Sequence, residues 1–250
     1  MVAGRGLIRN EVRRQLVSPV SWLVVAVFTM AAGAAFIMNL DAFLAASIEA
    51  LSAPPSHPVN VNQLLIRPFL VQSGIIALLL LPPITARALR RRSDMPPPAG
   101  TDDVPHVVGP FIGATAVYGV MLAATVVLVL ALFAFGTPEW GPIASAYIGL
   151  LLIGAAFIAG GLFISSLATS ALAAGAATCA LSLALAAVAW LADSAAAGAR
   201  PVFQRFSIGE PLNDFAKGVI DAGHIVTCVT IVAVALFLTR HTIRPGAVNR

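Results

Sequence analysis

The side chains that could carry out chemistry are few in this chain, and their spacing argues against a catalytic centre. The histidines are His57, His106, His224 and His241. They fall in separate segments, without the short spacing of zinc ligands. Ser165 and Ser166 could supply an intramembrane nucleophile, but no base accompanies them, so a polar helix turn is the favoured interpretation. Cys179 and Cys228 lie within apolar runs, as packing residues do. No Walker-type phosphate loop is present, so we expect the chain not to hydrolyse ATP itself.

Basic side chains are the one chemical group that is concentrated. Only 10% of the residues are charged, yet four arginines fall within six positions, directly after an apolar run: Arg87, Arg90, Arg91 and Arg92. A second basic group, Arg5, Arg9, Arg13 and Arg14, precedes another apolar run. The net charge of +4 could suggest a nucleic-acid partner. We reject that interpretation, because basic residues beside membrane spans give the same balance.

The elements that position these groups are membrane helices. The chain of 250 residues is 59% apolar, with a mean hydropathy of +0.92, well above soluble domains. A helix needs about 20 apolar residues to cross the hydrocarbon core. Charge-free runs therefore predict an all-α, polytopic membrane protein that forms a single transmembrane domain over residues 1–250. Its six spans are expected at about 19–40, 68–87, 109–135, 142–164, 171–191 and 222–240.

Basic residues predict the orientation of these spans. With both termini in the cytoplasm, eleven basic residues lie inside and four outside, as the positive-inside rule requires. Residues 1–18 form a basic amphipathic helix, expected to lie in the cytoplasmic interface. A secretion signal is the minor alternative, since the first apolar run is longer than a signal's core.

Three connecting segments carry further expectations. Residues 41–67 contain several prolines and predict a short amphipathic helix followed by an extended piece. Residues 87–108 form a cytoplasmic loop in which Pro96, Pro97 and Pro98 cannot continue a helix. Residues 193–223 place apolar side chains at helical spacing, which predicts an extracytoplasmic re-entrant segment.

The order of several motifs resembles a known family. The motifs are 13–20 (RRQLVSPV), 80–87 (LLPPITAR), 147–157 (YIGLLLIGAAF), 161–167 (GLFISSL) and 215–221 (FAKGVID). Together they resemble the permease subunits of ABC-2-type transporters, in the branch of gliding-motility and nitrous-oxide-reductase-maturation permeases. The resemblance extends over most of the chain, from about residue 7 to 244.

The resemblance implies partners and site residues. It implies a dimer of like or unlike permeases in the bacterial cytoplasmic (inner) membrane, driven as an exporter by a separate dimeric ATP-binding subunit. That subunit would hold ATP and magnesium, and this chain would bind no cofactor. ATPase coupling is then expected at Arg9, Arg13, Arg14, Arg90, Arg91, Arg92, Asp94, Asp102 and Asp103. An extracytoplasmic gate is expected at Phe206, Phe215, Lys217 and Asp221.

The loop after the second span departs from the family pattern. A leucine-rich helical piece is missing there, and the three prolines favour polyproline II. This leaves a second function open, a membrane assembly or anchoring protein that keeps the fold without the transport cycle. An intramembrane enzyme is disfavoured because no catalytic constellation is visible.

Overall fold

The chain folds into a bundle of long helices. The computed structural model describes residues 2–52, 60–93, 104–134, 138–194, 209–219 and 221–243, and these residues contain helices and no strand. Six helices are long and apolar enough to cross a membrane: Pro19–Leu51, Asn62–Leu80, Val107–Leu132, Trp140–Leu167, Ala171–Val188 and Ala222–Thr242. The predicted all-helical, six-span architecture of a multi-pass membrane protein is confirmed at this level.

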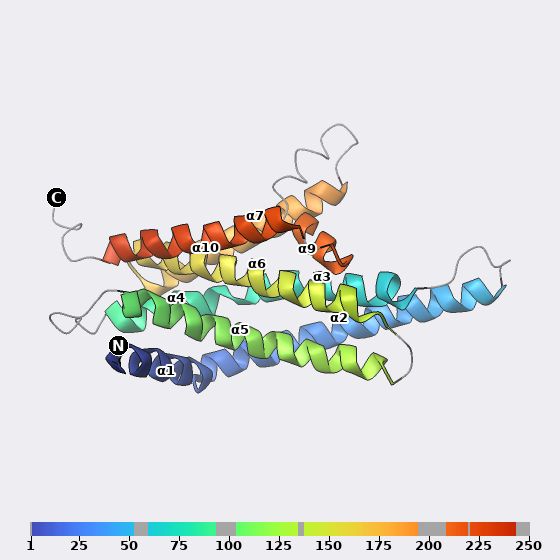
Figure 1. Ribbon diagram of the computed structural model, residues 1–250, viewed down its shortest axis with the longest axis horizontal. Helices are drawn as coiled ribbons and strands as arrows, with labels where there is room; N and C mark the ends of the chain where they lie inside the picture. Colours follow the sequence, from blue (N-terminus) through green and yellow to red (C-terminus); the bar gives the residue numbers. More distant parts are fainter. Residues whose placement is uncertain are drawn as a thin grey trace.

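The helices lie along the long axis of the molecule (Figure 1). In chain order they are α1 (Val2–Leu16), α2 (Pro19–Ser52), the π-helix η1 (Asn62–Ile66), α3 (Arg67–Leu80), α4 (Pro82–Ser93), α5 (Val104–Leu132), α6 (Trp140–Leu167), α7 (Ala171–Ser194), α9 (Gly209–Ala216) and α10 (Ala222–Ile243). One end of the bundle holds α1, the end of α4 and the end of α10, and we call it the basic end. We call the opposite end, which holds η1 and α9, the α9 end.

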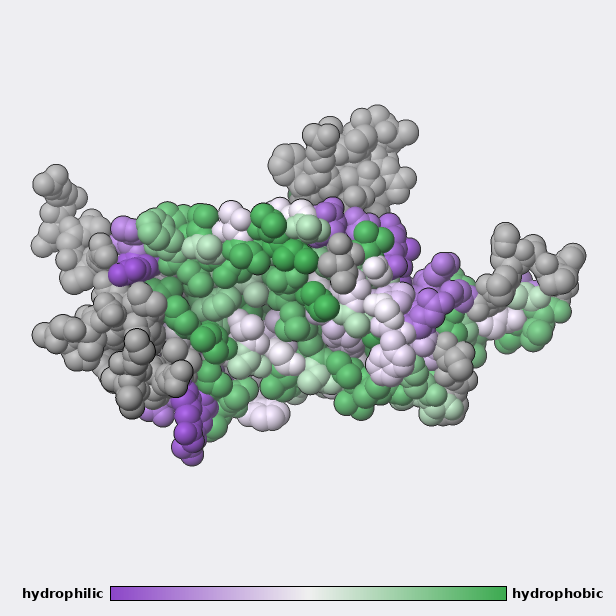
Figure 2. Space-filling view, in the orientation of Figure 1, coloured by the Kyte–Doolittle hydropathy of each residue, from purple (hydrophilic) through white to green (hydrophobic). Residues whose placement is uncertain are grey.

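Two helices form the centre of the bundle. The spans in η1–α3 and α6 are 44% and 50% buried, whereas those of α7 and α10 are each 17% buried. Tyr118 of α5 is fully buried against α6, where its hydroxyl donates to the Leu150 carbonyl at 2.8 Å. Gly154 leaves the room for that ring. Apolar side chains cover the middle of the bundle, and hydrophilic ones gather near its ends (Figure 2).

The first span is longer than expected, which corrects the prediction for residues 41–67. No separate amphipathic helix follows residue 40, because α2 continues without a break to Ser52. Alanines after Asp41 favour helix, and a single acidic residue costs too little to end it. The 34 residues of α2 reach about 51 Å at 1.5 Å per residue, and the last turns extend past the other helices (Figure 1).

The second predicted span, 68–87, is two helices in the structure. The spanning helix begins earlier, with η1 at Asn62, and a bend at Leu81 separates α3 from α4. Pro82 and Pro83 have no amide N–H, so they begin α4 where a continuing helix would need those donors. The Leu78 carbonyl, which Pro82 cannot satisfy, accepts a hydrogen bond of 3.1 Å from Ser182 Oγ of α7.

A short turn separates α6 from α7. Ser165 and Ser166 belong to the last turn of α6, and the turn itself covers residues 168–170. Ser170 caps α7, since its hydroxyl accepts a hydrogen bond of 3.0 Å from the Ala173 amide. Ser165 Oγ donates at 2.8 Å to the Gly161 carbonyl of its own helix. Both results agree with a polar helix turn at this place.

Candidate functional site

At the α9 end, a short helix is seated on two glycines. α9 turns Leu212 and Phe215 inward, and both side chains are fully buried. Leu212 lies over Gly74 of α3, where a Cβ atom would come within 2.8 Å of its Cδ2. Phe215 lies over Gly149 of α6, where a Cβ atom would come within 2.6 Å of its Cδ2. Only residues without a side chain leave room for this approach, so the two glycines hold α9 against the bundle.

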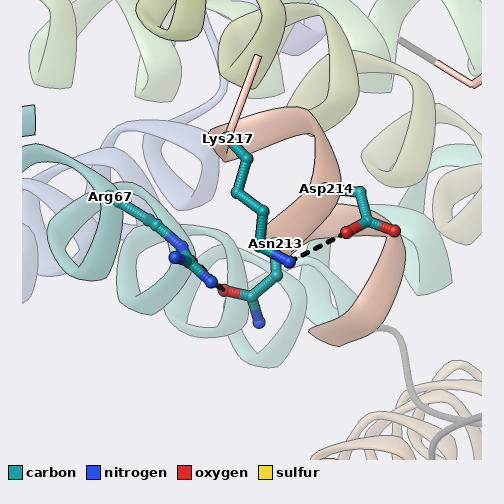
Figure 3. A network of polar contacts seen from close by, with 4 residues as sticks. All are labelled: Arg67, Asn213, Asp214 and Lys217. Atoms are coloured by element: carbon teal, nitrogen blue, oxygen red, sulfur yellow. Dashed lines mark hydrogen bonds and ion pairs between the residues drawn. The ribbon is translucent and has the colours of Figure 1, made fainter. Parts of the chain in front are cut away.

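Polar contacts hold the outward side of α9 (Figure 3). Arg67, the first residue of α3, donates to Asn213 Oδ1 from Nε at 3.3 Å and from Nη2 at 3.1 Å. Lys217 forms an ion pair of 3.2 Å with Asp214 one turn earlier. The Arg67 contact joins residues 146 positions apart, so it fixes α9 to the start of the second span.

Tight local geometry connects α9 to α10. Gly218 has a φ of +87°, a left-handed conformation that favours glycine, and it lies against Pro142 of α6. Asp221 then begins α10, because its Oδ1 accepts a hydrogen bond of 2.8 Å from the Gly223 amide. Local contacts therefore hold the connection from α9 to α10, just as Gly74 and Gly149 hold α9 itself.

The residues predicted to form an extracytoplasmic gate have separate places here. Phe215 is packed inside the seat, Lys217 is paired with Asp214, and Asp221 caps α10. Phe206 lies outside the described residues. The described members lie on or next to α9 and do not line one opening.

The π-helix adds a further fixed point at the α9 end. Asn62 donates from Nδ2 to the Glu139 carbonyl at 3.1 Å and accepts the Glu139 amide on Oδ1 at 3.3 Å. This reciprocal pair ties η1 to the residue before α6. Single π turns occur often at functional sites.

At the basic end, α1 packs on the bundle through polar side chains. Glu11 and Gln15 are buried, each 8% exposed, and Gln15 Nε2 donates to the Pro110 carbonyl of α5 at 3.3 Å. Gly113 of α5 permits the approach, because a Cβ atom there would lie 2.8 Å from Gln15 Cδ. The helix is thus attached to α5 along an inward face that is partly polar.

The predicted coupling residues divide between exposed positions and undescribed ones. Arg9, Arg13 and Arg14 are exposed on α1, and Arg90, Arg91 and Arg92 belong to the last turn of α4. Asp94, Asp102 and Asp103 lie outside the described residues. One arginine of α1, Arg14, and one of α4, Arg87, line a shared hollow.

Several of these site residues were not identified from the sequence. Arg67 was not assigned to a site, and its guanidinium donates to Asn213. Glu11 and Gln15 follow one another at a spacing of four, which is a helical-face signal. Gly74 and Gly149 gave no signal, because the seat depends on contacts between distant segments.

Within the described ranges, no group of three or more metal-ligating side chains comes together. No family model, curated protein or solved structure matches this chain.

Proposed function

We propose that this chain is the membrane-spanning permease subunit of an ABC-2-type transporter, working as an exporter and driven by a separate ATP-binding subunit. The observation that carries the proposal is the basic end, where the exposed arginines of α1 lie at the same end of the bundle as the arginine-rich last turn of α4 (Figure 1). A peripheral ATPase needs such a docking surface next to helices that continue into the membrane. α4 meets this need, since it follows directly on the spanning helix α3.

The opposite end supports the same proposal. A transporter that alternates its access must close one end while the other opens. α9 closes the bundle by packing two buried side chains onto α3 and α6, the two most buried spans. Because Arg67 joins α9 to α3, a movement of α3 is transmitted to this closure.

An exposed face of α7 supports pairing with a second permease. Small side chains run along it at helical spacing, all exposed: Ala173, Ala177, Ala180, Ala184 and Ala187. Small residues let membrane helices approach closely. Because lipid is as apolar as the side chains, the hydrophobic effect does not drive helices together in a membrane, and dispersion contacts stabilise the pair instead. The second permease would cover this face, and lipid would cover the remaining apolar surface.

Copurification tests the proposal. The tagged chain is purified from its source membranes in a mild detergent, and bound proteins are identified by mass spectrometry with ATP hydrolysis as the second readout. We expect a nucleotide-binding chain, and we expect the Arg9→Glu, Arg13→Glu double variant to retain about one tenth of it, since each reversal replaces attraction with repulsion.

A matched control makes the result specific. Glu49→Lys changes an exposed charge at the far end of α2 and should leave copurification unchanged. Absence of any nucleotide-binding chain from the wild-type preparation would refute the permease proposal. If an ATPase binds but hydrolyses ATP at the same rate with and without this chain, the anchoring function would be favoured instead.

A further inference from the structure

We infer that the hollow between α1, α2 and α4 binds the phosphate of an anionic phospholipid headgroup, such as that of phosphatidylglycerol. The shared chemistry is a singly charged phosphodiester. The site involves membrane lipid and is independent of any ATP-binding partner.

The hollow is built from three helices. Its polar lining comes from α1 (Glu11, Arg14, Gln15), from the α1–α2 junction and first turn of α2 (Ser18, Ser21) and from α4 (Arg87). Its cavity measures about 30 Å³. One water-sized group needs about 10–15 Å³ in this measure. The cavity therefore has room for the two free oxygens of a phosphodiester, while the rest of the headgroup extends outward.

The start of α2 supplies backbone donors to this hollow. The Trp22 amide makes the first hydrogen bond within the helix, to the Ser18 carbonyl at 3.2 Å. The preceding amides of Val20 and Ser21 have no acceptor within the helix, and Pro19 has no amide proton. The N-terminus of a long helix also carries a partial positive charge, so it favours an anion.

The charge of the lining fits a monoanion. Arg14 and Arg87 are both exposed and line the hollow from opposite helices, and Glu11 is the acidic residue there. One positive charge remains after Glu11 is counted. A phosphodiester carries one negative charge, whereas a zwitterionic headgroup such as phosphocholine would leave the excess positive charge unpaired.

The depth of the hollow suits a lipid headgroup. α2 is charge-free from Pro19 to Leu40, so Ser18 and Ser21 lie where the chain enters the hydrocarbon core. Phospholipid phosphates lie at this same level. Basic pockets between spans at the membrane surface bind anionic headgroups in the same way.

Native mass spectrometry of the full chain in detergent tests the inference. The protein is titrated separately with dioleoyl phosphatidylglycerol, dioleoyl phosphatidylmethanol and dioleoyl phosphatidylcholine. We expect phosphatidylglycerol to bind about tenfold more tightly than phosphatidylcholine. The Arg14→Gln, Arg87→Gln double variant should lose this preference, because charge-assisted hydrogen bonds to the phosphate are removed.

Two comparisons separate the parts of the site. Arg13→Gln removes an exposed charge of the same helix that does not line the hollow, and it should keep the preference for phosphatidylglycerol. Phosphatidylmethanol should bind as tightly as phosphatidylglycerol, because the phosphate is the recognised group, and both should exceed phosphatidylcholine. Size-exclusion profiles identical to the wild type establish that each variant is folded.

Three outcomes would overturn the inference. Equal loss in Arg13→Gln and in the double variant would mean attraction by general surface charge. Equal affinity for the three lipids would mean no headgroup recognition. Displacement of phosphatidylglycerol by an equal concentration of inorganic phosphate would assign the hollow to a free anion.

Discussion

The packing of Phe215 against Gly149 leads to the most specific prediction about what stabilises this fold. A Cβ atom added at Gly149 would lie 2.6 Å from both Cβ and Cδ2 of Phe215, closer than carbon atoms pack. Overpacking of this kind costs about 1–3 kcal/mol. Since Phe215 is fully buried, we expect Gly149→Ala to weaken the docking of α9 by that amount.

Hydrogen exchange measured by mass spectrometry in detergent detects the change. A loss of about 1–3 kcal/mol in local stability corresponds to about 5- to 150-fold faster exchange. The acceleration should be confined to α9 and its junction with α10. Amides in the buried centre of α6 should keep their exchange rates, because the clash forces the short helix outward and leaves the long one in place.

A control and a rescue test the mechanism. Gly160 is in the same helix, and a Cβ atom there meets nothing within 4 Å, so Gly160→Ala should leave α9 unchanged. Phe215→Ala alone should also loosen α9. Added to Gly149→Ala, it should cost much less than the sum of the single effects, because the clashing ring is gone. Additive effects, or a Gly149→Ala variant as stable as Gly160→Ala, would refute the claim that close packing of Phe215 on Gly149 holds α9.

Three further predictions concern hydrogen bonds between helices. Arg67→Met removes both bonds to Asn213, so exchange in α9 should become about tenfold faster, the effect of losing about 1.4 kcal/mol. Ser182→Ala leaves the Leu78 carbonyl unpaired beside the bend and should lower the free energy of unfolding by about 0.6–1.7 kcal/mol. Tyr118→Phe removes a buried hydroxyl bond and should lower it by about 1 kcal/mol; unfolding in detergent mixtures measures both changes.

Matched hydroxyl substitutions provide the baseline for these measurements. Thr227 is exposed and Thr242 is partly exposed, and each hydroxyl donates to a carbonyl of its own helix. Their alanine variants should change the free energy of unfolding by less than about 0.5 kcal/mol. Losses as large as those at Ser182 or Tyr118 would show that hydrogen bonds between helices contribute no more to stability than those within one helix.

The sequence was sufficient for the spans because they follow from local chemistry. A charge-free run of adequate length can only be helical in a membrane, and the turn between α6 and α7 carries its own polar cap at Ser170. The continuation of α2 past Asp41 was missed because a charge was taken as the end of a helix. A charge ends the membrane-embedded part, whereas the helix ends where backbone propensity changes.

The candidate sites were harder to predict because they depend on distant contacts. Gly74 and Gly149 resemble any other small residue of an alanine-rich and glycine-rich chain until α9 is placed over them. Arg67 and Asn213 have no shared pattern along the chain. Glu11 was overlooked among the arginines of α1, although its spacing from Gln15 places both on one helical face.

The paired prolines between α3 and α4 also have a mechanical consequence. In a continuous helix, amides at positions 82 and 83 would bond to the carbonyls of residues 78 and 79 and stiffen the axis. Neither proline has such a proton, so these two bonds are missing. The joint keeps the bonds of Leu81, whose amide donates to Ala77 and whose carbonyl accepts from Ile84 and Thr85, and the Ser182 hydroxyl of α7 bonds to the Leu78 carbonyl beside it. α4 therefore has fewer main-chain bonds to α3 than a continuous helix would have, so less is lost when the angle between these two helices changes.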